Sequence, residues 1–594
     1  MKKIFILLAF VGTAITVTAQ STISPNGRIK AEKHDKHFTV SYKQNGKWME
    51  IYTAKMEGIN GGSTRNIKED YQMLSGKKLH CTNKGKETVY SLQSGGVLRI
   101  RVYNDGVAFQ KVGRESTGDQ AETDVNITIP HYENTWIMNW TDGAEGFYPK
   151  NRSLKAGDRL SYPALFEFPN QVFALLTEAD IRHDQAASSF YSVDGKNEFN
   201  IKHDQNDQTA QQSSWKIMMI GSLADMVEST LVTDLSTPCK LTDTSWIEPG
   251  VVSWVYWAYN HGSNDMNIIR KYVDFAATLH LPYVLIDAEW DEMKDGKSVV
   301  DAVNYAKEKG VKPMIWYNSS VGWVNGAPGP KYRLNKPEDR EKEFAWCEKI
   351  GVAGVKVDFF SGDNNMNMAY CIDLMECAAR HHLTINFHGA TLPRGWQRTY
   401  PNLLSTEGVY GAEWYNNVPT FTDKAACHNA TLPFTRNVIG SMDYTPCAFS
   451  DSQHPHITSH AHELALTALY ESGLQHLADR PESFLAQPQE VQDYLSGLPT
   501  VWDETRFISG YPGESAVLAR RNGQTWYIAG INGTDEEKTL DVTSFRIKGK
   551  HSVTIFEDSG QKESPWDIRT VTSLPQYVTC QPRGGFVWVV KELK

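Results

Sequence analysis

The sequence predicts a multidomain α/β plus all-β protein, in which a (β/α)8 TIM barrel is flanked by an N-terminal β-sandwich and a C-terminal antiparallel β-domain. The chain has 594 residues, enough for roughly two to four domains at about 150 residues each. Short alternating runs occupy both ends, whereas apolar strands alternate with helical segments in the middle. We therefore expect the sandwich over residues 21–247, the barrel over 248–498 and the C-terminal domain over 499–594.

Residues 1–20 have the pattern of a secretory signal peptide. Two lysines precede an apolar run over residues 4–17, and small residues follow up to Ala19. This run is too short for a stable membrane-spanning helix, and no later segment reaches about eighteen apolar residues. We expect cleavage beside Ala19 or Gln20 and export to the bacterial periplasm, with no lasting membrane contact.

The first domain is predicted from its frequent short strands. Residues 37–42, 97–102 and 171–176 are alternating or β-branched runs, and Gly, Asn and Asp interrupt the chain between such runs. This spacing of strands and turns is typical of an antiparallel β-sandwich.

The middle of the chain alternates buried-type strands with helical segments such as residues 268–280. Most strand starts lie about thirty residues apart, the length of one βα unit, which favours a (β/α)8 barrel. A doubly wound open sheet would need a switch point and usually a Gly-rich phosphate loop, and the sequence shows neither. The predicted strands are residues 252–257, 283–287, 313–317, 354–359, 383–387, 403–406, 437–440 and 473–477.

The end of the chain returns to strands, at residues 525–531, 552–556 and 585–590. Asn522-Gly523 lies between two such runs and predicts a hairpin turn. We therefore expect a small all-β domain that packs against the barrel.

Composition restricts the class of ligand. The chain has 60 basic and 70 acidic side chains and a formal charge of −10, which is the wrong sign for a protein whose main partner is nucleic acid. Its 17 Trp, 26 Tyr and 23 Phe exceed what the core needs. Such aromatic residues often serve as flat platforms for ligands, and sugars are one such class.

Several of the predicted barrel strands end in polar residues. In a barrel of this type, the carboxyl ends of the strands meet at one rim and carry the active site. The residues at or just after these ends are Asp287, Asn318, Ser319, Lys356, Asp358, His388, Glu407 and Glu413.

Lys356 and Asp358 are two positions apart on one strand, so their side chains share a face. A neighbouring lysine would keep the aspartate ionised by lowering its pKa, although a structural ion pair fits this spacing equally well. Glu413 could face Asp358 across the rim and provide the second carboxylate that glycoside hydrolysis requires. The sequence has neither a His-Glu-x-x-His zinc helix nor a Gly-x-Ser-x-Gly nucleophile elbow.

With these residues in view, the sequence resembles glycoside hydrolase family 97 over essentially the whole mature chain. These are exported bacterial α-glycosidases with a β-sandwich, a (β/α)8 barrel and a C-terminal β-domain. The segments that carry the resemblance are Thr177-Glu178-Ala179-Asp180, Trp246-Ile247-Glu248-Pro249-Gly250, Arg398-Thr399-Tyr400-Pro401-Asn402-Leu403, and Glu407 with Glu413.

The resemblance also implies a mechanism. Inverting members carry base glutamates after the third and fifth strands, where this chain has Ser319 and Gly389. The chain has Asp358 at the fourth strand instead, as the retaining, α-galactosidase-like members do. Because a retaining enzyme uses its second carboxylate as the nucleophile, we expect Asp358 to be the nucleophile and Glu413 the acid/base of an exo-acting retaining α-galactosidase.

The family further implies a calcium ion, held here through Glu178, Glu407 and Glu413. Calcium prefers clustered carboxylate oxygens and would offset their mutual repulsion. Inverting members use a calcium ligand at the position that Gly389 occupies here. The alternative role for Glu178 is a surface salt bridge.

We expect residues near the same rim to bind the sugar. Asp287, Lys356 and His388 could hydrogen-bond hydroxyl groups, and Trp316 could stack on a ring face, as could Trp290 or Trp414. Each of these side chains could instead serve core packing.

The expected substrate is an oligosaccharide or polysaccharide with terminal α-galactosyl groups. A β-L-arabinopyranosidase or an α-glucosidase on the same scaffold is an alternative, since such sugars differ by one group or one hydroxyl orientation. A non-catalytic carbohydrate-binding protein is the alternative of another class.

Overall fold

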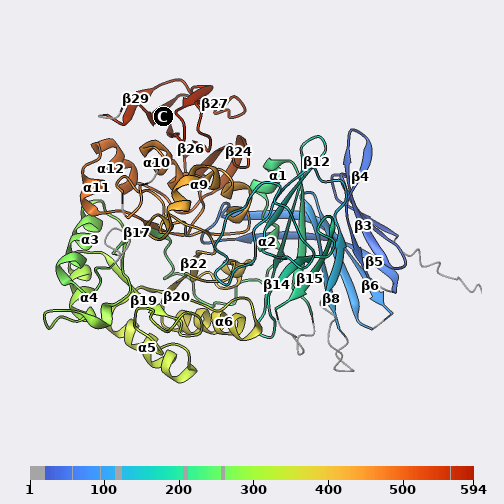
Figure 1. The fold of residues 1–594 in the computed structure, drawn as a ribbon, viewed down its shortest axis with the longest axis horizontal. Helices are drawn as coiled ribbons and strands as arrows, with labels where there is room; N and C mark the ends of the chain where they lie inside the picture. Colours follow the sequence, from blue (N-terminus) through green and yellow to red (C-terminus); the bar gives the residue numbers. More distant parts are fainter. Residues whose placement is uncertain are drawn as a thin grey trace, which may run out of the picture.

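The computed structural model describes residues 20–593, apart from residues 57, 94, 114–123, 205–211, 256–260, 452, 456 and 562–563. The predicted signal peptide therefore lies almost entirely outside the described residues. Figure 1 shows the sandwich beside the barrel, with the C-terminal strands (red) next to helices α10 and α12 at the top of the view. The three-part architecture predicted from the sequence is confirmed.

The sandwich consists of two eight-stranded antiparallel sheets. The first has the order β1-β2-β3-β4-β9-β15-β14-β11, and the second has the order β10-β12-β13-β16-β8-β7-β6-β5. The strands are β1 (Ser21–Ile23), β2 (Ile29–Lys33), β3 (His37–Gln44), β4 (Lys47–Lys55), β5 (Ile59–Gln72), β6 (His80–Leu92), β7 (Val97–Tyr103), β8 (Gly106–Val112), β9 (Val125–Thr128), β10 (Asn134–Trp136), β11 (Arg159–Leu160), β12 (Ala164–Phe168), β13 (Val172–Ala179), β14 (Ser188–Ser192), β15 (Glu198–His203) and β16 (Trp215–Gly221).

The second sheet is buried on both faces near its centre. Every residue of β12, β13 and β16 is buried, because one face packs on the first sheet while helices α1 (Leu223–Glu228) and α2 (Leu231–Asp234) contact the other side. This double burial explains why these strands are mostly apolar on both faces, with Glu167, Glu178 and Lys216 as buried charged exceptions. Helix α1 starts at a capping box between Ser222 and Asp225.

The barrel has seven parallel strands in the order β22-β21-β20-β19-β18-β17-β23. They occupy seven of the eight predicted positions, although the predicted strand 252–257 is shifted and its last two residues lie outside the described part of the chain. The strands are β17 (Gly250–Trp254), β18 (Tyr283–Ile286), β19 (Lys312–Asn318), β20 (Gly354–Asp358), β21 (Thr384–Phe387), β22 (Leu403–Thr406) and β23 (Leu474–Leu477).

The predicted strand over residues 437–440 is wrong. The chain forms a 3-10 turn there, because the buried Arg436 guanidinium donates hydrogen bonds to the backbone carbonyls of Thr406, Glu407, Gly408, Gly440 and Ser441. Met442 bridges Thr406 in parallel and donates its backbone N–H to Glu471. An irregular segment therefore closes the wall between β22 and β23.

Helices cover the outside of the barrel. Helix α3 begins at an Asp265 cap and buries one apolar face, and α5 begins with a proline and ends at the left-handed Gly351. The helices and 3-10 turns are α3 (Met266–Thr278), η1 (Trp290–Glu292), α4 (Val299–Glu308), α5 (Pro337–Ile350), α6 (Asn365–Arg380), α7 (Trp396–Thr399), α8 (Trp414–Asn417), α9 (Pro419–Asn429), η2 (Leu432–Phe434), η3 (Arg436–Val438), α10 (His460–Leu469), α11 (Pro481–Leu485) and α12 (Gln489–Ser496).

The C-terminal domain contains a six-stranded sheet of order β24-β25-β26-β31-β28-β29 and the pair β27-β30. Helix α10 of the barrel packs on β26 and β31, and the predicted Asn522-Gly523 hairpin joins β25 to β26. No helix within the described ranges is both long and apolar enough to cross a membrane. The strands are β24 (Glu504–Tyr511), β25 (Ser515–Asn522), β26 (Thr525–Asn532), β27 (Lys538–Asp541), β28 (His551–Asp558), β29 (Trp566–Val571), β30 (Tyr577–Cys580) and β31 (Gly585–Glu592).

Candidate active site

A cavity of about 470 Å³ opens at the carboxyl ends of the barrel strands. Its size lies within the range typical of small-molecule sites. The structure brings six of the predicted site residues together around it, namely Asp287, Trp316, Lys356, Asp358, Glu407 and Glu413.

Asp358 ends strand β20 and lies in the cavity wall with 8% of its surface exposed. Its two carboxylate oxygens accept hydrogen bonds from the Phe359 backbone N–H at 2.8 Å and from the Trp316 indole at 3.0 Å. Burial raises the pKa of the Asp358 carboxyl, while the charges of Lys356 and His388 oppose that rise. The carboxylate is thus held in one orientation by two donors.

Lys356 lies at the floor of the cavity between two acids. Its ammonium group is 3.2 Å from Asp287 and 3.9 Å from Asp358, and it lies over the Trp254 ring. Burial alone would lower the pKa of Lys356, but Asp287 and Asp358 raise it above its usual value. The lysine is therefore a permanent positive charge beside the Asp358 carboxylate.

Ser319 and Gly389, where the resemblance places the bases of inverting members, both lie against Asp358 or the turn that follows it. The backbone N–H and the hydroxyl of Ser319 donate to the carbonyls of Asp358 and Phe359, so this residue supports the turn after β20. Gly389 adopts φ +46°, and a Cβ there would lie 2.9 Å from Asp358 Oδ1. A side chain at position 389 and the observed Asp358 carboxylate would compete for the same space.

Beneath the cavity, a line of buried ionisable groups supports Glu407. His388 lies 3.4 Å from Glu407 and 2.7 Å from Asp443, and the same Asp443 oxygen accepts from Asn386 and lies 2.8 Å from His476. Burial alone would lower the pKa of His388, but Glu407 and Asp443 raise it well above its usual value. The protonated form of His388 is therefore favoured, and the ring faces carboxylates on both sides.

Glu407 and Glu413 form an unequal carboxyl pair. Burial alone would raise the pKa of Glu407, but the charge of His388 and hydrogen bonds from neighbours, including the Gly389 backbone N–H, hold it at about 2. Burial and the Glu407 charge raise the pKa of Glu413 well above its usual value. Of the two carboxyls, Glu413 is thus the one that holds a proton more readily, as suits a general acid.

Glu145 is a site residue that the sequence analysis missed. It belongs to the sandwich, yet its carboxylate lines the cavity and accepts a 2.7 Å hydrogen bond from the Trp414 indole. Burial and the Glu407 charge raise the pKa of Glu145 well above its usual value. The local signal is an acid between glycines in Gly143-Ala144-Glu145-Gly146, within a non-strand segment between β10 and β11.

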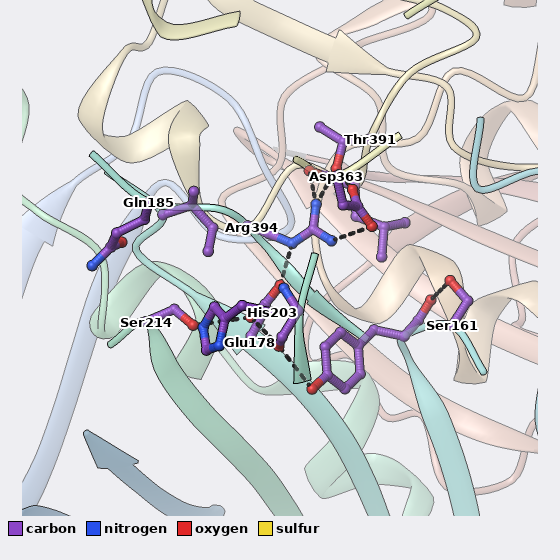
Figure 2. Close-up of polar contacts among 12 residues, drawn as sticks. Ser161, Glu178, Gln185, His203, Ser214, Asp363, Thr391 and Arg394 are labelled. Atoms are coloured by element: carbon purple, nitrogen blue, oxygen red, sulfur yellow. Dashed lines mark hydrogen bonds and ion pairs between the residues drawn. The ribbon is translucent and has the colours of Figure 1, made fainter. Parts of the chain in front are cut away.

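Glu178 lies in a different, fully buried network (Figure 2). Arg394 reaches from a barrel loop to Glu178 at 2.6 Å and to Asp363 at 3.3 Å. Lys216 and Ser188 also donate to the Glu178 carboxylate. Burial alone would raise the pKa of Glu178, but Lys216 and Arg394 hold it well below its usual range.

The structure thus corrects the prediction that Glu178 joins Glu407 and Glu413 as a calcium ligand. Two cationic side chains, Arg394 and Lys216, already neutralise its carboxylate, and a calcium ion there would be repelled by them. Of the three predicted ligands, only Glu407 and Glu413 lie close together, with His388 beside them.

Two predicted sugar contacts also lie elsewhere. His388 is 1% exposed and is not among the described residues that line the cavity, since its ring nitrogens face Glu407 and Asp443. Trp290 is buried and stacks on Trp346, so it packs the barrel exterior. Trp414, by contrast, lines the cavity.

The carboxylates of Glu145, Glu407 and Glu413 are candidate ligands of a hard divalent cation. Glu407 and Glu413 lie close to each other and to His388, and Glu145 lines the same cavity. The Glu407 charge raises the pKa values of the other two carboxyls. Oxygen donors of this kind are what calcium prefers, and a cation would relieve their repulsion.

Comparison with known proteins agrees with this geometry. Family profiles described as Glycosyl-hydrolase 97 N-terminal, Glycoside hydrolase 97 and Glycosyl-hydrolase 97 C-terminal, oligomerisation, match residues 23–238, 246–409 and 501–591. These three matches cover the three structural parts in order.

Individual relatives point the same way. The chain is 34% identical over 493 residues to a "Probable retaining alpha-galactosidase" of Streptomyces bingchenggensis, covering 80% of this chain and 74% of that protein. It is 25% identical over 565 residues to the "Retaining alpha-galactosidase" of Bacteroides thetaiotaomicron, covering 83% of each. A solved β-arabinopyranosidase superimposes with a TM-score of 0.86 at 26% identity, over 96% of this chain and 99% of that one. By its sequence and its fold, the chain belongs to glycoside hydrolase family 97 and is a hydrolase of carbohydrates.

Proposed function

We propose that this protein is an exo-acting retaining α-galactosidase whose nucleophile is Asp358 and whose acid/base is Glu413. The observation that carries the proposal is the Asp358 carboxylate, which occupies the space that Gly389 leaves open. Positions 319 and 389 hold Ser and Gly, so the bases of the inverting mechanism are missing. Two relatives named as retaining α-galactosidases support the sugar specificity.

In the first step, a carboxylate oxygen of Asp358 attacks the anomeric carbon while the bond to the leaving oxygen breaks. Lys356 and the Trp316 indole stabilise the ionised form of Asp358 before attack. Glu413 gives its proton to the departing oxygen, as its raised pKa allows.

In the second step, Glu413, now ionised, removes a proton from a water molecule. That water attacks the anomeric carbon of the ester and releases Asp358, and Glu413 regains its proton. Two displacements at one carbon return the sugar with its original anomeric configuration.

Asp287 and Lys356 are placed to recognise hydroxyl groups at the cavity floor. Asp287 accepts from the Trp254 indole and from the Ala288 backbone N–H, which fixes its plane. A charged, oriented donor and acceptor pair of this kind discriminates between hydroxyl orientations, because an unmatched hydroxyl leaves buried polar groups unpaired.

We also propose that Glu145, Glu407 and Glu413 hold the calcium ion that the family implies. When bound, the ion would supply positive charge that offsets the mutual repulsion of these three carboxyl groups. The carboxylates themselves come from the sandwich and the barrel, so the site joins two domains.

A β-L-arabinopyranosidase is the second candidate, because a solved enzyme of that name shares the fold at 26% identity. Its substrate has the ring hydroxyls of an α-galactoside without the C6 group. Kinetics on paired nitrophenyl α-galactoside and β-L-arabinopyranoside separate the two. A non-catalytic binding protein is disfavoured, since Asp358 and Glu413 share one cavity.

The deciding experiment is a proton NMR time course of 4-nitrophenyl α-galactoside hydrolysis. We expect α-galactose to appear before mutarotation, as double displacement through Asp358 requires. Initial β-galactose would mean a single displacement and would remove Asp358 as nucleophile. An absence of turnover with this substrate, together with turnover of the arabinopyranoside, would favour the second candidate.

A further inference from the structure

A second cavity of about 510 Å³ adjoins the catalytic cavity. The two cavities share Trp323 and Pro328 in their walls. The second is built by the loops that follow β17, β18 and β19, so it lies on the same rim of the barrel. Nothing in the catalytic steps above uses it.

Trp323 stands at the junction of the two cavities. It is 53% exposed, which is unusual for a tryptophan, and its indole N–H donates to the Asn325 carbonyl at 2.8 Å. Its ring packs edge-on against Phe359, the residue after the nucleophile, at 4.9 Å. The ring is therefore anchored while much of its surface remains available to a ligand.

The loop that carries Trp323 is held tightly at its start. Gly322 lies very close to the turn that follows β20. A Cβ on Gly322 would lie 2.3 Å from the Phe359 carbonyl oxygen and 2.5 Å from that of Phe360. Only glycine permits this contact, which places Trp323 beside the catalytic cavity.

The same loop is held at its other end by the turn after β18. The backbone N–H of Glu289 donates to the Gly329 carbonyl at 2.9 Å, and Glu289 adopts the left-handed φ of +74°. A Cβ on Gly329 would lie 2.8 Å from Asp291. Strained backbone that its surroundings hold in place is frequent at ligand sites, and here it shapes the cavity wall.

The wall of the second cavity is acidic. Glu289, Asp291 and Glu292 line it, against Lys331 and His261. His261 lies 3.0 Å from Glu289, so it pairs with one of these acids. The remaining negative charge would repel an anionic ligand and accept hydrogen bonds from hydroxyl or ammonium groups.

We propose that this second cavity is the leaving-group subsite. There the Trp323 ring stacks on a neutral or cationic sugar unit, the one that is released when the glycosidic bond is cleaved. The inference rests on the proposed exo-acting function. An exo-acting enzyme encloses the terminal sugar, so the rest of the substrate extends only on the leaving-group side. A half-exposed indole beside hydroxyl-binding acids is the surface that a pyranose ring fits.

The test compares three substrates that share one terminal sugar and differ in the leaving group: a glycosyl fluoride, a 4-nitrophenyl glycoside and a disaccharide. With Trp323→Ala, we expect kcat/KM for the disaccharide to fall about tenfold further than kcat/KM for the fluoride, which offers no ring to stack. Trp323→Phe should recover part of the loss. Equal losses on all three substrates, or none, would overturn the proposal.

Trp48→Ala is the matched control. Trp48 is a partly exposed tryptophan on β4 of the sandwich, 39% exposed, and its removal should leave the kinetics on all three substrates unchanged. A loss with Trp48→Ala equal to that of Trp323→Ala would show a nonspecific effect and count against the subsite.

A second measurement tests the charge of the cavity itself. It compares aryl glycosides with a neutral and a carboxylate para substituent on wild type and on Asp291→Asn/Glu292→Gln. We expect the carboxylate-to-neutral ratio of kcat/KM to rise about threefold to tenfold in the variant. Because each ratio is compared between proteins, leaving-group reactivity cancels. An unchanged ratio would remove the acidic wall from the binding surface.

The terminal sugar is chosen first, by assaying wild type on nitrophenyl α-galactoside, β-L-arabinopyranoside and α-glucoside. If the galactoside is inert, the proposed sugar specificity fails while the leaving-group comparison proceeds with the sugar that is turned over. The two proposals can therefore fail separately.

Discussion

Gly389 is the residue whose geometry bears most directly on the proposed mechanism. Its missing side chain leaves room for the carboxylate of Asp358, and its left-handed φ of +46° suits glycine. Its backbone N–H also donates to Glu407 at 2.6 Å. A Cβ at this position would lie 2.9 Å from Asp358 Oδ1 and from the Phe359 backbone nitrogen, so a side chain at 389 would require Asp358 and the turn after β20 to move.

We predict that Gly389→Ala lowers kcat by about a hundredfold, because a displacement of the nucleophile by about 1 Å is that costly. The variant should still fold, since the strain of a left-handed alanine is about 1 kcal/mol. Steady-state kinetics and thermal unfolding measure the two effects.

Gly46→Ala controls for backbone strain alone. Gly46 has φ +80° in the hairpin between β3 and β4, and no neighbouring atom lies within 4 Å of the point where a Cβ would stand. It should lose only the strain of a left-handed residue and no activity, whereas Gly389→Ala should lose more stability because its Cβ would also lie 2.9 Å from Asp358 Oδ1 and from the Phe359 backbone nitrogen. Full activity in Gly389→Ala would show that Asp358 does not need the space.

His203 predicts an acid-sensitive contribution to stability. Burial and the charge of Lys216, whose ammonium is 3.3 Å away, lower the pKa of His203 from 6.5 to about 3. Between these values the unfolded chain binds a proton that the folded protein does not, so stability falls as pH drops below 6.5.

We predict that lowering the pH from 7 to 5 costs wild type about 2 kcal/mol through this histidine, from about 1.36 kcal/mol per pH unit. His203→Gln should lose that part of the pH dependence in denaturant unfolding. The exposed His34→Gln should keep it. If His203→Gln and wild type showed the same dependence of stability on pH, His203 would bind its proton equally in the folded and unfolded states and would not contribute.

At the scale of elements, a buried network ties strand β13 to the barrel loop after β21. Arg394 is 216 positions from Glu178 in the sequence, and the pair lies at 2.6 Å (Figure 2). Asp363 and Thr391 bind the same guanidinium. This loop contains Gly389, which lines the cavity, so the network helps to place the backbone there.

We predict that Glu178→Ala destabilises the protein by about 3–5 kcal/mol, because it removes the acid paired with buried Lys216 and leaves Arg394 paired with Asp363 alone. Denaturant unfolding gives the value. Glu32→Ala, which removes a partly exposed pair with Lys30, should cost less than about 1 kcal/mol. Equal effects of the two substitutions would show that the Glu178 carboxylate is not needed for charge balance.

At the scale of the whole molecule, the cavity is shared between domains. Glu145 comes from the sandwich, whereas Glu407 and Glu413 come from the barrel. A cation held by all three would join the domains, so removing it should affect stability as well as catalysis.

We predict that Glu145→Gln lowers calcium affinity by about tenfold or more, since affinity depends on the number of charged ligands. Glu178→Gln should leave the affinity unchanged. Isothermal titration of chelator-treated protein measures both, and thermal unfolding with and without chelator reports the coupling to stability. Loss of calcium binding in Glu178→Gln, with retention in Glu145→Gln, would reverse the assignment.

Much of the rim was predictable from local pattern. Alternation along β20 predicts that Lys356 and Asp358 share a face, and both line the cavity. Glu407 and Glu413 follow β22 and meet the same rim, as parallel strands require. The irregular wall at residues 436–442 was not predictable, because Arg436 and its carbonyl partners, rather than an apolar run, shape it.

The sequence by itself determined the three-part fold and the acids at the strand ends, because hydrophobic periodicity and parallel-strand geometry are local properties that a chain carries along its length. The family followed from the resemblance of its motifs. Only the tertiary structure decided that Glu145 reaches the cavity and that Glu178 is neutralised by cations. Their partners Trp414 and Arg394 lie 269 and 216 positions away. No local period relates residues so far apart, so their environments and charges depend on how the domains pack.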